Sequence, residues 1–204
     1  MIGGGRRAGG GTILAMGTTA DVRIPMWPLT VDDFDRMVEA DILGPADRVE
    51  LLNGQLAEMT PHSPEHSGLL QWLAARLIRA VDPDVASVRV QLPLRFVPLS
   101  EPEPDIAIVP AARYTREHPT TAMLVIEVAL TSRAIDLGTK AEIYAAAGIA
   151  EYWVVDIAAR AIHVHTSPGT GGYRSTRRAT TGSLRPDVPG APAIEIETLF
   201  ALLD

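Results

Sequence analysis

Two apolar segments in the middle of the chain each carry a carboxylate, and this pairing constrains the fold more than any other feature. Asp105 stands directly before the run Ile106–Val109, and Glu127 interrupts the strand-like run Met123–Val128. Moving a carboxylate out of water costs several kcal/mol, as an order of magnitude, unless a cation or a basic group accompanies it. The sequence therefore predicts strands that converge on a charged site.

The residues around these acids indicate what accompanies them. Asp105 follows Pro104, which favours extended backbone and places the acid at the mouth of a strand. If the two strands are neighbours, both carboxylates reach one cation, and Lys140 lies a short way downstream. Carboxylate oxygens without cysteine or a dense histidine cluster suit Mg²⁺ or Mn²⁺. Such an ion activates water and stabilises the charge that develops on a phosphodiester.

The first half of the chain contains three further elements with clear signals. Residues Thr30–Glu39 predict a helix with a capping box from Thr30 to Asp33 and an apolar stripe that includes Val38. The Asn53-Gly54 pair inside RVELLNGQLAEM predicts a hairpin that carries Glu50. Periodic leucines predict a helix over Ser67–Val81, with Ile78 on its apolar face.

The remaining segments complete a mixed α/β domain. The elements expected are a strand over Ser87–Val97, a helix over Leu137–Ala147 ended by Gly148, strands over Glu151–Asp156 and Ala161–Thr166, a glycine-rich loop over Gly169–Gly172, and a short helix in the closing IEIETLFALLD. Pro93 inside the first of these implies a sheet edge or a bulge.

The composition limits the cellular setting and the domain count. The chain has 204 residues, which fits one domain over residues 21–204 after a glycine-rich, disordered segment at residues 1–20. The absence of cysteine favours a reducing, cytoplasmic location, and no apolar run has the roughly 20 residues that a membrane helix needs. The net charge of −7 argues against strong binding of nucleic acid through bulk charge.

The order of several short motifs resembles a known family. The matching pieces are VELLNGQLAEMTPHSPEH, EPDIAIV, LVIEVALTS, the spacing Asp136…Lys140…Tyr144, and AGIAEYWVVD, which together span Thr30 to His165. They resemble the Uma-type restriction endonucleases of the PD-(D/E)XK nuclease superfamily. The resemblance implies a restriction-endonuclease-like mixed sheet flanked by helices, with an N-terminal hairpin and helix. It also implies a metal-dependent endonuclease that hydrolyses DNA and acts as a homodimer.

The same resemblance assigns roles to individual residues. Asp105 and Glu127 correspond to the metal ligands, with help from the backbone carbonyl of Val128. The position two after Glu127, where the motif would have lysine, is Ala129. Lys140 from the following helix is then the candidate that orients or deprotonates the attacking water. Glu50 resembles the acid that many such nucleases add from an earlier element.

Each of these residues also has a structural interpretation. Asp105 would cap a strand end, Glu127 would pair with Arg133, and Lys140 would face solvent on an amphipathic helix. Glu50 would have no direct catalytic role. His62 and His66 precede the predicted helix, where capping or solvent exposure competes with a substrate contact.

Three further groups have open interpretations. His163 and His165 share one face of a strand and would form a metal pair only with a third ligand, which is not nearby in the sequence. Tyr152 and Trp153 are expected in the core or in a dimer contact. A cluster of basic residues after the glycine-rich loop would either contact phosphate or be solvated. Its members are Arg174, Arg177 and Arg178.

Two functions compete with a nuclease. Ala129 at the lysine position and the acidic net charge favour a catalytically weak or inactive nuclease-fold protein that binds DNA or another protein. A structural oligomerisation domain explains least, because it leaves Glu127 in an apolar strand without a reason.

Overall fold

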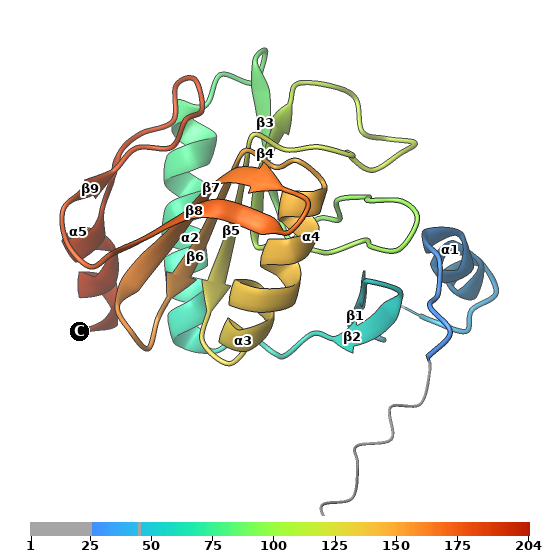
Figure 1. Ribbon diagram of the computed structural model, residues 1–204. Helices are drawn as coiled ribbons and strands as arrows, with labels where there is room; N and C mark the ends of the chain where they lie inside the picture. Colours follow the sequence, from blue (N-terminus) through green and yellow to red (C-terminus); the bar gives the residue numbers. More distant parts are fainter. Residues whose placement is uncertain (1–25, 45) are drawn as a thin grey trace, which may run out of the picture.

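The computed structural model describes residues 26–44 and 46–204, and its centre is a six-stranded sheet (Figure 1). The disorder expected for residues 1–20 lies outside the described residues. In spatial order the strands are β3 (Ala86–Val90), β4 (Ile106–Pro110), β5 (Leu124–Ala129), β6 (Glu151–Asp156), β7 (Ala161–Gly169) and β8 (Gly172–Ala179). Strands β5 and β6 are parallel, and all other neighbours in this sheet are antiparallel. The predicted mixed α/β fold is confirmed.

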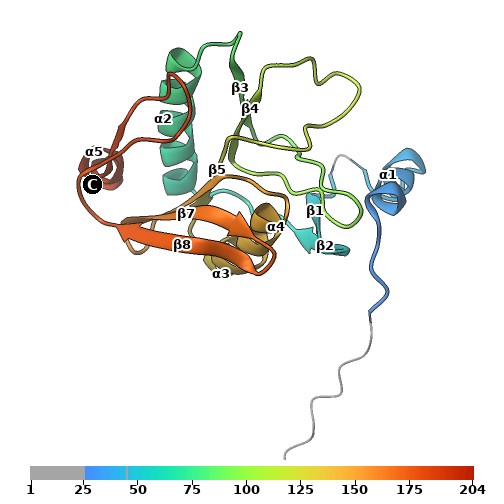
Figure 2. The ribbon, with the colours of Figure 1, turned by 45° about the horizontal axis from the view of Figure 1, so that its top comes forward.

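Helices cover both faces of this sheet because side chains of a strand alternate between its faces. On one face lie α2 (Pro64–Ala80), α5 (Ile196–Phe200) and a 3₁₀ turn (Ala201–Leu203), and Figure 2 shows α2 and α5 together on this side. The leucines of α2 at positions 69, 73 and 77 are fully buried there. Ile78, which was expected on the same apolar face, is 56% exposed, so that part of the prediction is wrong.

The helical connection between β5 and β6 covers the other face. It consists of α3 (Arg133–Ile135), a π-helical turn (Asp136–Lys140) and α4 (Ala141–Ala146). Gly148 follows with φ +75°, which is the left-handed conformation of a helix C′ glycine. The helix predicted over Leu137–Ala147 thus exists, but it starts earlier and contains a π turn that the sequence pattern did not indicate. The π turn brings Asp136 and Lys140 toward the interior, where both are buried.

The N-terminal part follows its local signals closely. Helix α1 (Val31–Glu39) has the expected capping box, but Val38 of its predicted apolar stripe is 49% exposed. The hairpin of β1 (Val49–Leu52) and β2 (Gln55–Glu58) turns through Asn53 and Gly54 at φ 49° and 78°. A Cβ at position 54 would lie 2.5 Å from Pro28 Cβ, so glycine is required there for space as well as for φ.

Two sequence expectations about strands are wrong. Strand β3 ends at Val90 instead of Val97, because Gln91 has φ +52° and Pro93 follows. Residues after the glycine turn form β8, which pairs with β7 as an edge strand. Its outward arginines hid the alternation that marks a strand. A short pair of β9 (Ser183–Leu184) and β10 (Ile194–Glu195) leads into α5.

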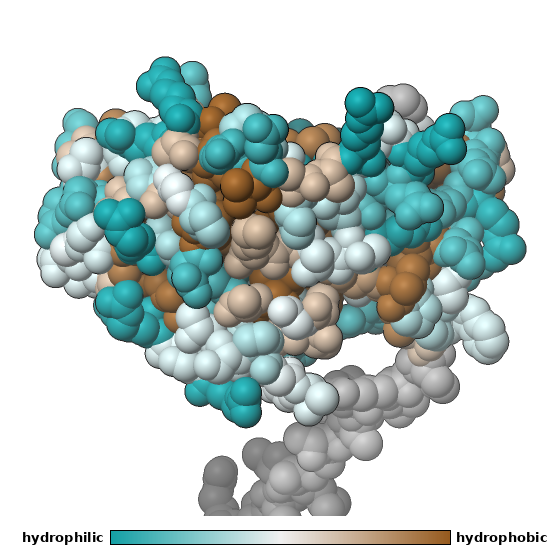
Figure 3. All heavy atoms as spheres, turned by 90° about the horizontal axis from the view of Figure 1, so that it is seen from above, coloured by the Kyte–Doolittle hydropathy of each residue, from teal (hydrophilic) through white to brown (hydrophobic). Residues whose placement is uncertain are grey.

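On the face seen from above, hydrophilic and hydrophobic residues are mixed (Figure 3). None of the described helices combines the length and the hydropathy needed to cross a membrane.

Candidate functional site

One pocket gathers the predicted site residues from distant parts of the chain. Its walls come from the first hairpin, the start of α2, the entrance to β4, the end of β5 and the π turn. The acidic residues that line it are Glu50, Glu58, Glu103, Asp105, Glu127 and Asp136. Lys140 is the one lysine or arginine in the same lining. The pocket is therefore rich in negative charge.

Glu127 lies at the centre of this arrangement. It is 3% exposed, and its Oε1 accepts hydrogen bonds from Lys140 Nζ at 3.1 Å and from the Tyr144 hydroxyl at 2.9 Å. Lys140 Nζ also lies 3.1 Å from Glu50 Oε2. The lysine thus bridges two carboxylates, one from β5 and one from the hairpin. The alternative that Glu127 pairs with Arg133 is wrong, because Arg133 Nε lies 2.5 Å from Asp156 Oδ2 instead.

The electrostatics of these groups reflect burial and crowding. Burial raises the pKa of Glu127 well above its ordinary value, and Asp136, Asp105 and Glu50 raise it further. Burial opposes the charge of Lys140, but Glu127, Glu50 and Asp136 outweigh it and raise the lysine pKa. Lys140 therefore holds its proton. The alternative of a solvent-facing lysine is also wrong, since Lys140 is 6% exposed.

Asp105 is held at the entrance to β4 by several donors. Its Oδ2 accepts the backbone N–H of Val128 at 2.8 Å and lies 3.0 Å from His66 Nε2. Its own N–H donates to Glu127 Oε2 at 3.2 Å. Burial alone would raise the pKa of Asp105, but His66, the Val128 N–H and Lys140 together lower it. Asp105 is thus a charged carboxylate beside Glu127, where adjacent strands were expected to bring it.

Val128 takes part through its backbone. Its N–H points toward Asp105, where β4 has not yet begun to pair with β5. The N–H and C=O of one strand residue point to the same side of the strand, so we expect the Val128 carbonyl on the side of Asp105. The side chain is buried in the apolar core on the α2 face.

His66 and His62 lie on the other side of Asp105. His66 is in the first turn of α2, which begins three residues earlier than predicted, with Ser63 as the N-cap and Pro64 at its start. His62 stacks on His66 with ring centroids 4.1 Å apart. Burial and the neighbouring His66 lower the pKa of His62. His66 thus contacts Asp105, His62 stacks on His66, and the helix cap is Ser63 instead of a histidine.

The π turn adds a further acid to the pocket. Asp136 is 2% exposed and accepts a hydrogen bond from Ser132 Oγ at 2.5 Å. Burial raises its pKa from 3.8 to about 6, against the opposing effect of Lys140. Asp136 and Lys140 are four residues apart on this turn, and both contribute to the pocket. π turns of this kind occur frequently at functional sites.

The other residues singled out by the sequence lie elsewhere. Tyr152 and Trp153 are core residues with at most 1% exposure. His165 stacks on Tyr152, and His163 Nε2 lies 3.6 Å from Asp156 Oδ2. The basic cluster of β8 is exposed, and its members Arg174, Arg177 and Arg178 do not line the pocket.

Sequence reasoning gave no role to Gln91, Asp136 or Tyr144, although the last two belong to the quoted spacing. One signal was present in the sequence and unused: Lys140 is the only lysine among 204 residues, whereas the other 17 basic residues are arginine. A chain that uses arginine everywhere else and lysine once indicates a position where a compact ammonium is needed.

The donor set of the pocket fits a hard divalent cation. Asp105 and Glu127 offer carboxylate oxygens, and Val128, next to Glu127 in the chain, adds a backbone carbonyl outside the pocket lining. Oxygen atoms are the ligands of Mg²⁺ and Mn²⁺. Burial is the main reason that the pKa values of Glu127 and Asp136 are raised, and neighbouring carboxylates raise both further against the opposing effect of Lys140.

Comparisons with known proteins agree with this architecture. The family model Uma2, described as "Putative restriction endonuclease", matches residues 31–198. A crystal structure of "a putative nuclease belonging to DUF820 from Anabaena variabilis ATCC 29413" superposes with a TM-score of 0.70 at 19% identity, covering 87% of this chain and 100% of that one. At this identity the likeness concerns the fold. No curated protein matches the chain.

Proposed function

The chain belongs to the Uma2 family, and from this premise we propose that it is a metal-dependent endonuclease that hydrolyses phosphodiester bonds in DNA. One observation carries the proposal. The Lys140 ammonium contacts Glu127 and Glu50 at 3.1 Å each, and the Asp105 N–H contacts the same Glu127. Four residues from separate elements thus meet in one open pocket, and this supports a site of the PD-(D/E)XK type in which Lys140 replaces the lysine that the motif would have at Ala129.

The roles of the residues follow from their contacts. Asp105, Glu127 and the Val128 carbonyl would hold the cation, which when bound supplies a Lewis acid for the phosphate and an acidified water. Tyr144 and Lys140 fix the Glu127 carboxylate by donating to its Oε1. The Val128 N–H fixes Asp105.

Lys140 acts as a charged donor in this proposal. Because Glu127 and Glu50 raise its pKa, it does not accept a proton from water at neutral pH. It instead orients the water and stabilises the negative charge that develops on the phosphate. The sequence left orienting and deprotonating as alternatives, and the electrostatics favour orienting. The helix supplies this lysine in place of Ala129, which weakens the main argument for an inactive protein.

DNA is the proposed substrate, and a homodimer would present two pockets to the two strands. The pocket is acidic, so a bound cation would also reduce the repulsion between these carboxylates and a phosphate. Binding without cleavage is the competing function, and the experiment below separates the two.

Plasmid cleavage tests the proposal. Purified protein is incubated with supercoiled plasmid and Mg²⁺ or Mn²⁺, in parallel with Asp105→Asn and Glu127→Gln. Nicking or linearisation should be lost with chelator and fall at least about 10²-fold in each variant, by analogy with the removal of other groups that stabilise a transition state. Arg79→Gln, at an exposed position in the last turn of α2 and outside the pocket, is the matched control and should cleave normally. Cleavage that survives in both acid variants would disprove the site. A folded wild type that binds plasmid but never cuts it would favour the binding function.

A further inference from the structure

A second cluster beside the acids differs from them in chemistry, because it contains imidazole nitrogens. Among the described residues, the group of three histidine or acidic side chains whose ligand atoms all lie within 4.8 Å of one another consists of His62, His66 and Asp105. The same distance criterion does not group the acids Glu50, Asp105 and Glu127, because Lys140 lies between the two glutamates. The closest ligand cluster is therefore mixed nitrogen and oxygen.

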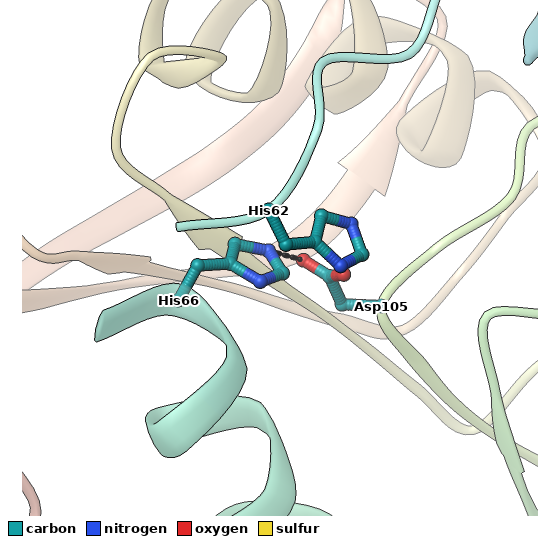
Figure 4. A group of neighbouring side chains, drawn as sticks. All are labelled: His62, His66 and Asp105. Carbon is teal, nitrogen blue, oxygen red and sulfur yellow. Dashed lines mark hydrogen bonds and ion pairs between the residues drawn. The ribbon is translucent and has the colours of Figure 1, made fainter. Parts of the chain in front are cut away.

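The three side chains come from separate positions and point toward one another. Figure 4 shows His62 from the segment before α2, His66 from the first turn of α2 and Asp105 from the entrance to β4. Two of them already have the spacing of metal ligands: His66 Nε2 and Asp105 Oδ2 are 3.0 Å apart, and ligands on a tetrahedral Zn²⁺ at about 2.0–2.1 Å lie about 3.4 Å from each other.

Local backbone features hold the cluster in place. Pro64 disfavours helical backbone at Ser63, which keeps this residue extended at ψ 163° and places His62 over His66. Gln91 adopts φ +52°, a backbone conformation that residues with a side chain rarely adopt. Its amide nitrogen lies 3.1 Å from His62 Nε2 and 3.3 Å from Asp105 Oδ1. A strained residue thus positions two members of the group.

We propose that His62, His66 and Asp105 form a binding site for a borderline divalent transition-metal ion such as Zn²⁺, distinct from the all-oxygen site at Asp105 and Glu127. Imidazole nitrogens prefer such ions, whereas Mg²⁺ prefers oxygen. Three protein ligands leave a fourth position for water, and all three residues line the open pocket. Gln91, which donates to the remaining oxygen of Asp105, orients that ligand from outside. Because Asp105 belongs to both sites, an ion here lies next to the proposed catalytic acids.

The composition of the chain makes this site testable with little interference. There is no cysteine, and there are only five histidines, so few other groups compete for Zn²⁺. The protein must carry no histidine tag. His118 is 40% exposed and lies outside the cluster, which makes His118→Ala the matched control.

Calorimetric titration of the chelator-treated full chain with ZnCl₂ tests the proposal, and the visible absorption of bound Co²⁺ reports nitrogen ligands independently. One ion per chain is expected. The affinity should fall at least about tenfold in His62→Ala and in His66→Asn, and stay unchanged in His118→Ala. His62 lies outside the helix and is half-buried, so His62→Ala decides the matter even if His66→Asn fails to fold.

Glu127→Gln separates this inference from the proposed function. The variant should keep the Zn²⁺ affinity, because Glu127 is not a ligand of the second site. Wild-type affinity in His62→Ala, or loss of binding in Glu127→Gln with both histidine variants intact, would overturn the inference. Histidine-dependent binding in a protein that never cleaves DNA would leave it standing and reject the nuclease proposal instead.

Discussion

Glu127 and Glu151 are both buried glutamates on the adjacent parallel strands β5 and β6, yet their surroundings differ completely. Glu127 faces the α4 side, meets Lys140 and Tyr144, and lines the pocket. Glu151 stands at the opposite end of its strand, on the α2 side. Its two oxygens accept the indole N–H of Trp153 at 2.6 Å and the backbone N–H of Asp187 at 2.7 Å. It forms no ion pair with any of the described residues.

The comparison teaches that burial alone does not mark a functional carboxylate. Glu151 has one neutral donor for each oxygen, which is the arrangement of a structural acid. Glu127 instead shares one lysine with Glu50 and is crowded by further acids. A buried carboxylate that is surrounded by other ionisable groups, such as Glu127, is therefore the better candidate for chemistry.

The largest effect that would sharpen this contrast is expected from Lys140→Met. Removing the ammonium leaves Glu50 and Glu127 buried without a counter-charge, which should cost about 3–5 kcal/mol of unfolding free energy near pH 8 and abolish cleavage. Urea unfolding measures the loss. Adding Glu127→Gln to the same chain should recover part of it, because one of the unpaired charges is gone. If Lys140→Met lost no more unfolding free energy than Arg174→Met, a variant at an exposed position, Lys140 would not be what stabilises the two buried acids.

A smaller effect is expected from Asp136→Asn, which tests the crowding around Glu127. The pKa of Asp136 is raised from 3.8 to about 6, so the folded state binds its proton more tightly than the unfolded state does. Stability contributed by this proton is complete below about pH 4 and is lost as the pH rises through 6. Relative to the wild type, the asparagine variant should therefore gain on the order of 2–3 kcal/mol between pH 4 and pH 7.5.

Urea unfolding at several pH values measures this difference, and the pH-independent loss of the Ser132 hydrogen bond cancels from it. Asp84→Asn, at an exposed acid outside the pocket, is the control. Parallel stability profiles of wild type and Asp136→Asn would contradict the crowding.

The smallest effect is expected from Glu151→Gln. Each oxygen of Glu151 accepts from a different N–H, and glutamine offers one acceptor and one N–H₂ group, so one donor must lose its partner. The expected cost is about 1–2 kcal/mol of unfolding free energy, with normal plasmid cleavage. Glu127→Gln should show the reverse in the cleavage assay, which is loss of cleavage. If both variants behaved alike in cleavage, the distinction between the two glutamates would fail.

Much of the fold was predictable because its signals are local. The Asn53-Gly54 hairpin, the Thr30–Asp33 capping box and the apolar strands β4, β5 and β6 depend on neighbouring residues, and the structure has them all. Strand β8 was missed because its outward side chains are arginines at a sheet edge. The early end of β3 depends on the single positive φ of Gln91.

The sequence singled out residues of the candidate pocket, but it did not predict the contacts between them. Asp105 and Glu127 stood out as acids in apolar runs, and adjacent strands then bring them together. Lys140 lies thirteen residues after Glu127 and reaches it through the π turn that ends at Lys140, and no periodicity in the sequence indicates that turn. The position of His66 depends on the true start of α2, which Ser63 and Pro64 set.

The single lysine of this chain also gives the protein an intrinsic chemical reporter. Apart from the α-amino group, Lys140 carries the only primary amine, so an amine-reactive label on the folded protein can mark one side chain. That amine is buried and paired with two carboxylates, so it reacts only when a local movement exposes it and the proton leaves. The labelling rate of this one position therefore measures how often Lys140 becomes exposed, without any engineered probe.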